Sequence, residues 1–445
     1  MIRIASLLTI EFVAPDSGTA LSILLMCETL PQIIITPLGG ILADRYDRRR
    51  LMIIFDSIAT VGVLTYILAH RSGDLLYLYA ATIFRSCITA LYMPVSTSIT
   101  SMFVSDPEDL KRISLMNGMA WSIMLICGGL IGGFISAAFG VEACYLFDSG
   151  TYFLSVLCMK RVVGTFTVSP DSASKQHTIE SIFESKLEKE LEKKSIARRM
   201  RESIRRCFRP LCHCLGPTKN LLSYLFACGF GMLIFMKASA AVTWGSEDVL
   251  NVLISKVPGD EDESSRRLGI IIACQGFGSL LGPILANALL IDGRRPRTIQ
   301  TACIASFFLI IFGWVGIANA PNFELICFFT LVRCMGGSTI FLNSTLVLQN
   351  LTKPDMLGRV LAYQETLTNL LLTIMAYIAG NFEDSGFGKK EIAYLSASLA
   401  VFFVAFWSSY HLFGLGAARK ESLYSDDDFF SRRASIDMLH SPAIV

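Results

Sequence analysis

Four ionisable side chains lie inside long apolar stretches of the 445-residue chain: Glu28, Arg85, Lys237 and Arg333. A charged group at membrane depth costs about 2.5–3.5 kcal/mol on insertion scales, so it usually faces an aqueous cavity or an opposite charge. A carboxylate beside a cation stays ionised until that partner is withdrawn, and it then takes up a proton. This is the chemistry that proton-coupled transport needs. We expect Glu28 to be the titrating group, with Arg85 or Lys237 as its partner.

The same residues also have structural explanations, which the sequence leaves open. Glu28 and Arg85 could form a fixed ion pair that aligns two helices. Lys237 could extend to the outer membrane surface beside Trp244, with its aliphatic stem in the apolar region. Arg333 is the first residue of the segment Arg333-Cys-Met-Gly-Gly337, and its position in the second half of the chain corresponds to that of Arg85 in the first half.

The composition is that of a multi-pass membrane protein. Hydrophobic residues make up 53% of the chain and charged residues 17%, whereas a soluble domain carries roughly 25% charged residues. Apolar runs of membrane length alternate with short charged loops, as in transmembrane helices. The 13 cysteines lie mostly inside the apolar runs without paired spacing, so we expect neither disulfides nor a metal site. No pattern suggests hydrolysis or cofactor chemistry, so we also expect no enzymatic activity and no cofactor. The sequence has no phosphate-binding loop of the G-x-x-x-x-G-K type, so we do not expect ATP-driven transport.

The apolar runs predict an all-α protein with two halves of six helices. Residues 1–161 form the first half, 162–219 a cytosolic linker with an amphipathic charged helix, 220–413 the second half, and 414–445 a cytosolic polar tail. The first run, residues 2–14, spans roughly 20 Å of the ~30 Å hydrocarbon core, so we expect helix 1 to be incomplete. The other helices are expected at residues 17–43, 51–69, 75–102, 113–138, 141–159, 220–243, 268–290, 299–318, 323–348, 360–380 and 392–413.

An internal repeat relates the two halves. Asp44 and Asp292 each close an apolar run before an arginine-rich loop, and they are 248 residues apart. Arg85 and Arg333 have the same separation. Such a repeat predicts two halves of parallel topology related by an axis along the membrane normal, an architecture in which transporters bind substrate between the halves.

Lysine and arginine mark one side of the predicted bundle. They gather in residues 45–50, 111–112, the linker, 294–297 and 353–359, whereas the opposite loop 245–265 is acidic. Positive loops face the cytosol, so the linker and the C-terminus are predicted to be cytosolic.

The most specific motif follows the second apolar run and reads Gly40-Ile-Leu-Ala-Asp-Arg-Tyr-Asp-Arg-Arg-Arg50. It resembles the G-x-L-a-D-R-x-G-R-R loop between helices 2 and 3 of the major facilitator superfamily. Asp47 replaces a glycine, as in the branch that contains the enterobactin exporter and the macrolide-efflux proteins. The resemblance extends over residues 17–413 and implies the fold of that superfamily. The matching residues are Gly40, Leu42, Asp44, Arg45, Arg48 and Arg49.

The resemblance implies that this loop is a gate. Asp44 is expected to contact the N-terminal end of helix 11, where the helix dipole and free N–H groups favour an anion. Arg45, Arg48 and Arg49 are expected to pair with acidic groups on neighbouring loops. Together these contacts would stabilise the state that is closed to the cytosol.

Two further stretches resemble motifs of the same family. Arg85 stands where the helix 4 pattern R-x-x-q-G has its arginine, although Ile88 and Thr89 replace the last two residues. The stretch Gly128-Gly-Leu-Ile-Gly-Gly133 resembles the antiporter motif G-P-x-x-G-G without its proline. Its small residues allow close helix approach. The expected helix-packing hinge consists of Gly128, Gly129, Gly132 and Gly133.

We therefore expect a secondary active transporter that exports a small amphipathic compound by alternating access, driven by proton entry. A passive or lipid-moving facilitator, like a lysophospholipid transporter, is one alternative, and a non-transporting membrane sensor or scaffold is another. The expected partners are a small-molecule substrate, protons and membrane lipid, with no nucleic acid, and the chain is expected to be monomeric. Asn117 and Asp148 are expected to form interhelical hydrogen bonds, and Ser435 in the tail resembles a kinase site.

Overall fold

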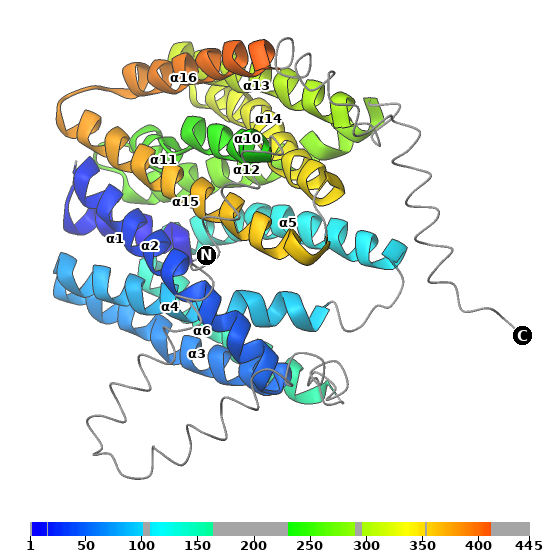
Figure 1. Cartoon of the computed structure of the whole chain (residues 1–445). Helices are drawn as coiled ribbons and strands as arrows, with labels where there is room; N and C mark the ends of the chain where they lie inside the picture. The colour runs from blue at the N-terminus through cyan, green and yellow to red at the C-terminus, as the bar shows by residue number, and fades with distance from the viewer. Residues whose placement is uncertain are drawn as a thin grey trace, which may run out of the picture.

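The computed structural model describes residues 2–15, 17–100, 107–162, 230–289, 296–351 and 354–410. All regular elements in these ranges are helices, and they form two groups (Figure 1). The first group contains α1 (Ile2–Val13), α2 (Gly18–Arg45), α3 (Arg48–Ser72), α4 (Leu75–Thr100), α5 (Pro107–Phe139) and α6 (Val141–Arg161). The second contains α10 (Phe230–Trp244), α11 (Glu247–Ser255), α12 (Glu261–Leu289), α13 (Pro296–Asn319), α14 (Phe323–Leu351), α15 (Pro354–Asp384) and α16 (Lys389–Ser409).

Eight helices in the described ranges are long and apolar enough to cross a membrane: α2, α3, α4, α5, α12, α13, α14 and α16. Large apolar side chains such as Val61, Leu76 and Phe402 are exposed on them. An apolar surface of this kind suits lipid, in which only helices with internally bonded backbones are stable. The structure therefore confirms the all-α polytopic fold expected from the sequence.

The loop between α2 and α3 contains only Tyr46 and Asp47. Asp47 is the N-cap of α3, and its carboxylate accepts the N–H of Arg50 (3.1 Å). An aspartate at this position accepts a hydrogen bond from a backbone N–H group at the start of the helix, whereas glycine has no side-chain acceptor to do so. This explains locally why Asp47 stands in the motif and why α3 begins three residues before the predicted start.

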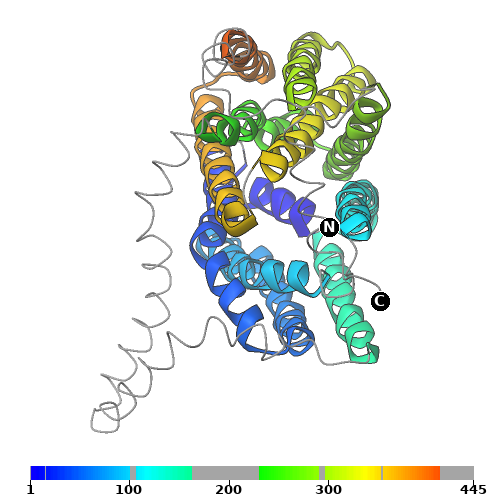
Figure 2. The same cartoon turned by 45° about the vertical axis from the view of Figure 1, so that its right-hand side comes forward.

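The two halves contact each other at one end of the bundle, which we call the joined end (Figures 1 and 2). Arg3 of α1 donates to Asp248 of α11 (2.5 Å). Asp384, the last residue of α15, accepts the N–H groups of Gly18 and Thr19 (2.7 and 2.9 Å). A carboxylate from one half therefore caps the first turn of α2 in the other half, where the helix dipole favours an anion.

Hydrogen bonds between α2 and α15 continue from Asp384 along the first half of α2. Ser22 donates to the carbonyl of Ala376 (2.8 Å), and the hydroxyls of Thr29 and Thr373 are 2.7 Å apart. Farther along α2, Gly40 has no atom within 4 Å of the place a Cβ would take. The contact between the halves is thus concentrated toward the joined end.

The structure corrects one part of the predicted topology. Residues 247–255 form the helix α11, whereas the sequence analysis placed them in an outer loop. Val249, Leu250 and Val252 are buried, but nine residues are too short to register as a membrane span. Several other helices begin earlier than predicted, at Pro107, Glu261 and Pro354, because their first turns are polar and extend beyond the apolar run. Residues 163–219 of the linker and the whole tail 414–445, with Ser435, lie outside the described residues.

Candidate functional site

The structure brings Glu28 and Arg85 together inside the first half. Glu28 on α2 accepts a hydrogen bond from the Arg85 guanidinium on α4, with 26% of the Glu28 side chain and 14% of the Arg85 side chain exposed. The Arg85 Nε also donates to the hydroxyl of Tyr66 (3.3 Å). The carboxylate is therefore paired with a cation and still reachable by water, which proton exchange requires.

A chain of hydroxyl groups surrounds this pair and connects four helices. Tyr66 of α3 donates to Thr82 of α4 (3.2 Å), and its ring lies 5.3 Å from that of Tyr145 in α6. Tyr145 in turn contacts the hydroxyl of Thr9 in α1 (2.7 Å). These four hydroxyl-bearing side chains are buried and form two hydrogen-bonded pairs, Tyr66–Thr82 and Thr9–Tyr145, which are joined by the contact between the two tyrosine rings.

Lys237 does not pair with Glu28 and does not extend to the membrane surface. Its ammonium on α10 bonds to Glu365 on α15, and it lies 5.1 Å from the ring centre of Phe341 on α14. The Lys237 side chain is 8% exposed and that of Glu365 is 54% exposed. Glu365 was not among the residues selected from the sequence, although it is the only acidic residue in the predicted helix 360–380 and the cost of charge at membrane depth applies to it as it does to Glu28.

Arg333 is 1% exposed and is held between an acid and an indole. Its guanidinium on α14 bonds to Glu247 on α11 and lies 4.3 Å from the ring centre of Trp314 on α13. Two other guanidinium nitrogens, Nε and Nη1, are buried with no hydrogen-bond partner in the described structure. Glu247 was missed because its segment was assigned to a loop. In the described conformation Arg333 is shielded from any aqueous path.

Arg85 and Arg333 occupy equivalent positions in the internal repeat, but the carboxylates that pair with them come from helices that are not equivalent. Arg85 takes Glu28 from α2, whereas Arg333 takes Glu247 from α11. The residue 248 positions after Glu28 is Gly276, and a Cβ there would lie 2.7 Å from the backbone nitrogen of Ile126 in α5. In the second half this position is a glycine that allows close contact between α12 and α5, whereas in the first half it carries the carboxylate of Glu28.

Arg48 and Arg49 of the gating motif contact backbone carbonyls. Arg48 is buried, and its Nε donates to the carbonyl of Ala43 (3.2 Å). Arg49 donates to the carbonyls of Met159 and Lys160 at the C-terminal end of α6 (2.9 and 2.7 Å). The family resemblance predicted acidic partners for Arg49. The end of a helix has unpaired carbonyls with partial negative charge and serves instead.

Other members of the motif are described to different extents. Leu42 packs against a buried apolar cluster that contains Leu51 and Phe55. The side chains of Asp44 and Arg45 lie outside the described structure, so the contact of Asp44 with helix 11 stays a prediction.

Two of the four glycines in α5 face the other half. A Cβ at Gly129 would lie 2.8 Å from the carbonyl oxygen of Gly269 in α12, and one at Gly133 would lie 2.8 Å from that of Ser265. Gly132 faces α6, where its carbonyl accepts from the Cys144 thiol (3.3 Å). For Gly128 the structure records partial burial. Close approach of α5 and α12 therefore depends on Gly129 and Gly133.

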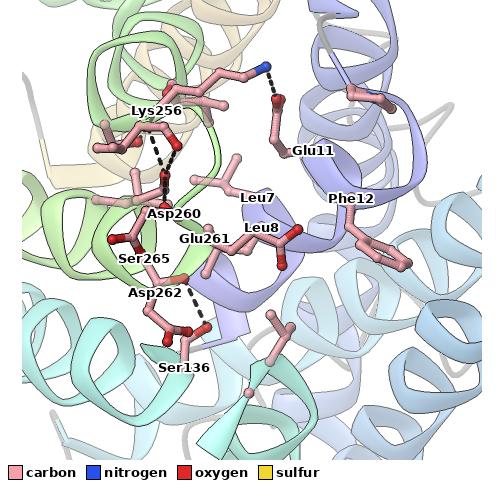
Figure 3. A pocket seen from close by; sticks show the side chains of 18 of the residues that line it. Leu7, Leu8, Glu11, Phe12, Ser136, Lys256, Asp260, Glu261, Asp262 and Ser265 are labelled. Carbon is pink, nitrogen blue, oxygen red and sulfur yellow. Dashed lines mark hydrogen bonds and ion pairs between the residues drawn. The ribbon is translucent and has the colours of Figure 1, made fainter. Parts of the chain in front are cut away.

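A cavity of about 720 Å³ opens at the joined end between the halves (Figure 3). Its apolar wall includes Leu7, Leu8 and Leu268. Lys256 and Glu11 form an ion pair across its edge (2.5 Å). Because this pair joins residues of the two halves, the cavity is a vestibule whose shape depends on how the halves meet. Its polar lining also includes His70, Asp260, Glu261 and Asp262.

Two further carboxylates are enclosed in the first half. Asp56 of α3 is buried and accepts from Ser155 of α6 (2.7 Å). Asp148 of α6, expected to form an interhelical hydrogen bond, has a buried Oδ2 with no partner in the described structure. The side chain of Asn117 lies outside the described residues.

Comparison with known proteins agrees with this arrangement. The profile described as Major Facilitator Superfamily matches residues 3–246. The uncharacterized MFS-type transporter YfiS of Bacillus subtilis (strain 168) is 27% identical over 160 residues, which cover 36% of this chain and 37% of that protein. Macrolide efflux protein A of Streptococcus pyogenes is 22% identical over 393 residues, which cover 86% of this chain and 85% of that protein. The crystal structure of the nucleoside transporter NupG superposes with a TM-score of 0.60 at 12% identity, covering 91% of this chain and 94% of NupG.

Proposed function

Because the chain belongs to the major facilitator superfamily, we propose that it exports a small amphipathic compound by alternating access, driven by proton entry. The chain is an integral, multi-pass membrane transporter of that family. The observation that carries the proposal is the Glu28–Arg85 pair, in which a partly exposed carboxylate on one helix of the first half meets a half-buried cation on another. A relative aligned over most of both chains is named a macrolide efflux protein, which supports the direction of transport.

The position of Glu28 on α2 supports coupling between proton binding and movement. The next residue, Thr29, is hydrogen-bonded to Thr373 of the other half (2.7 Å). Protonation of Glu28 removes its charge attraction for Arg85 and so weakens one of the contacts between α2 and α4, which are also joined by hydrogen bonds from Ser86 and Tyr79. Since α2 also bears the contacts to α15, the same event changes how the halves are held together.

The contacts between the halves support alternating access. They gather at the joined end, and the sequence places that end on the side opposite the positive loops. A substrate path open toward the cytosol would therefore be the starting state for export. Separation of the joined end would then release the substrate on the other side.

The test is proton flux in sealed inverted vesicles that contain the full-length chain, with candidate compounds added one at a time. We expect the substrate to trigger proton release, and we expect Glu28→Gln and Arg85→Ala to abolish it because each removes one member of the pair. Glu324→Gln is the matched control, since Glu324 is an exposed carboxylate on the first turn of α14. Movement of a labelled compound with no proton signal would show a passive facilitator and refute the coupling.

A further inference from the structure

The Lys237–Glu365 pair lies among side chains of the second half whose hydrogen-bonding capacity is only partly used. Lys237 lies beside the ring of Phe341, which is 4.9 Å from the ring of Trp244. The indole Nε1 of Trp244 is buried without a hydrogen-bond partner in the described structure, and so is the Nε2 of Gln364. Gln364 is fully buried, so an unpaired donor there is costly unless another molecule supplies an acceptor.

Glu365 lies on the face of α15 that meets the other half. Thr373, Ala376 and Gly380 contact α2 from this face, and they follow Glu365 by 8, 11 and 15 residues. At 3.6 residues per turn these spacings return to within about 80° of Glu365. The Glu365 side chain is 54% exposed, and the spacing places it within a quarter-turn of the residues of α15 that contact the first half. Glu365 is about 12 Å from Thr373 along the helix, away from the joined end.

In the Lys237–Glu365 pair, the carboxylate is exposed and the ammonium is buried. Glu365 Oε1 holds Lys237, whereas no described side chain donates to Oε2. The ammonium is buried, so a ligand that enters between the halves meets the carboxylate first. Aromatic faces such as those of Phe341 and Trp244 attract cations and repel anions.

We propose that Glu365 Oε2, with Phe341 and Trp244, binds the positively charged group of an amphipathic organic cation while Lys237 keeps Oε1. This inference rests on the proposed export function and names the substrate class. The buried donors of Trp244 and Gln364 would then suit an oxygen acceptor on the same molecule. Lys237 competes electrostatically with the bound cation, so it sets the affinity.

The test is equilibrium binding to the purified full-length chain in detergent micelles, with no ion gradient. The probe is rhodamine 6G, a flat aromatic monocation, and the readout is fluorescence anisotropy. We expect Glu365→Gln to weaken binding roughly tenfold, the worth of one hydrogen bond to a charged group. We expect Lys237→Met to strengthen binding severalfold, because it removes the competing charge and keeps a side chain of similar length on Phe341.

Two controls separate a binding role from a structural one. Glu324→Gln should leave rhodamine 6G affinity unchanged, and the neutral aromatic N-phenylnaphthylamine should bind equally to the wild type and to Glu365→Gln. Unchanged cation affinity in Glu365→Gln would refute the proposal, and so would weaker binding in Lys237→Met. If Glu365→Gln fails to fold, the direction of the Lys237→Met effect decides. Since no gradient is used, a failed proton-flux experiment would leave this result standing.

Discussion

Three carboxylates inside the bundle each hold a cation, and their exposure separates their roles. The side chain of Glu365 is 54% exposed, that of Glu28 is 26% exposed, and that of Glu247 is 16% exposed against an arginine with 1% exposure. A group that exchanges protons or binds substrate must be reached by water or ligand. Glu365 and Glu28 meet this condition, whereas Glu247 serves mainly to neutralise Arg333.

The burial of Arg333 leads to a prediction about stability. Glu247→Gln leaves a guanidinium buried without a counter-charge, and breaking a buried pair in this way costs about 3–5 kcal/mol. We expect a clear fall in the midpoint of thermal unfolding, measured by tryptophan fluorescence of the protein in detergent micelles. Glu324→Gln on the same helix as Arg333 serves as the control. An unfolding midpoint equal to that of the wild type would contradict a structural role for the Arg333–Glu247 pair.

Two helix pairs join the halves, and the repeat relates them while their chemistry differs. The α2–α15 contact uses a carboxylate cap from Asp384 and the Ser22 hydroxyl. The α5–α12 contact uses glycines, with Gly133 against Ser265 and Gly129 against Gly269. Absence of side chains lets α5 and α12 approach closely, because backbone atoms of one helix then contact backbone atoms of the other.

The glycine contact can be tested within one helix. Gly133→Ala places a methyl group about 2.8 Å from backbone atoms of α12, closer than van der Waals contact allows. We expect it to push the halves apart at the joined end, which lowers both the unfolding temperature and substrate-triggered proton release. Gly118→Ala is the matched control, since Gly118 also lies in α5 and has no atom within 4 Å of the Cβ position. Equal behaviour of the two variants would contradict the packing role of Gly133.

At the scale of the whole molecule, the halves meet along α2 and α15 and along α5 and α12 (Figure 2), and several polar contacts between them gather at the joined end. Ser136 of α5 and Ser265 of α12 face each other there, with their hydroxyl oxygens 3.3 Å apart. Arg3–Asp248 and Lys256–Glu11 connect the halves at the same end. If transport requires this end to separate, fixing it must stop transport without disturbing the fold.

A disulfide cross-link at the joined end tests whether transport requires this end to separate. In a background with the 13 native cysteines replaced, Ser136→Cys with Ser265→Cys puts two thiols at a distance suited to a disulfide. We expect oxidation to abolish substrate-triggered proton release and reduction to restore it. Each single variant should be insensitive to oxidant. Full transport by the cross-linked protein would show that the joined end does not open during the cycle.

Much of the architecture could be predicted from the sequence, because the membrane penalises exposed backbone and unpaired charge wherever they occur. Apolar runs located α2 to α6 and α12 to α16, with the largest differences, six or seven residues, at the polar first turns of α5, α12 and α15. The cost of charge at depth selected Glu28, Arg85, Lys237 and Arg333 before any contact was known. The motif around Asp47 and Arg49 placed the short loop between α2 and α3. These features depend on the local sequence and on the membrane as solvent.

Only the tertiary structure decided which charges meet. Glu28 pairs with Arg85 across 57 residues, Lys237 with Glu365 across 128, and Glu247 with Arg333 across 86. Each pairing depends on which helices pack together and on how far each is rotated, and neither is encoded in the spacing along one helix. The same reason hid α11, whose nine residues gain stability from burial against other helices. The sequence by itself determined where charges enter the membrane, and packing determined which are sealed and which stay open to a ligand.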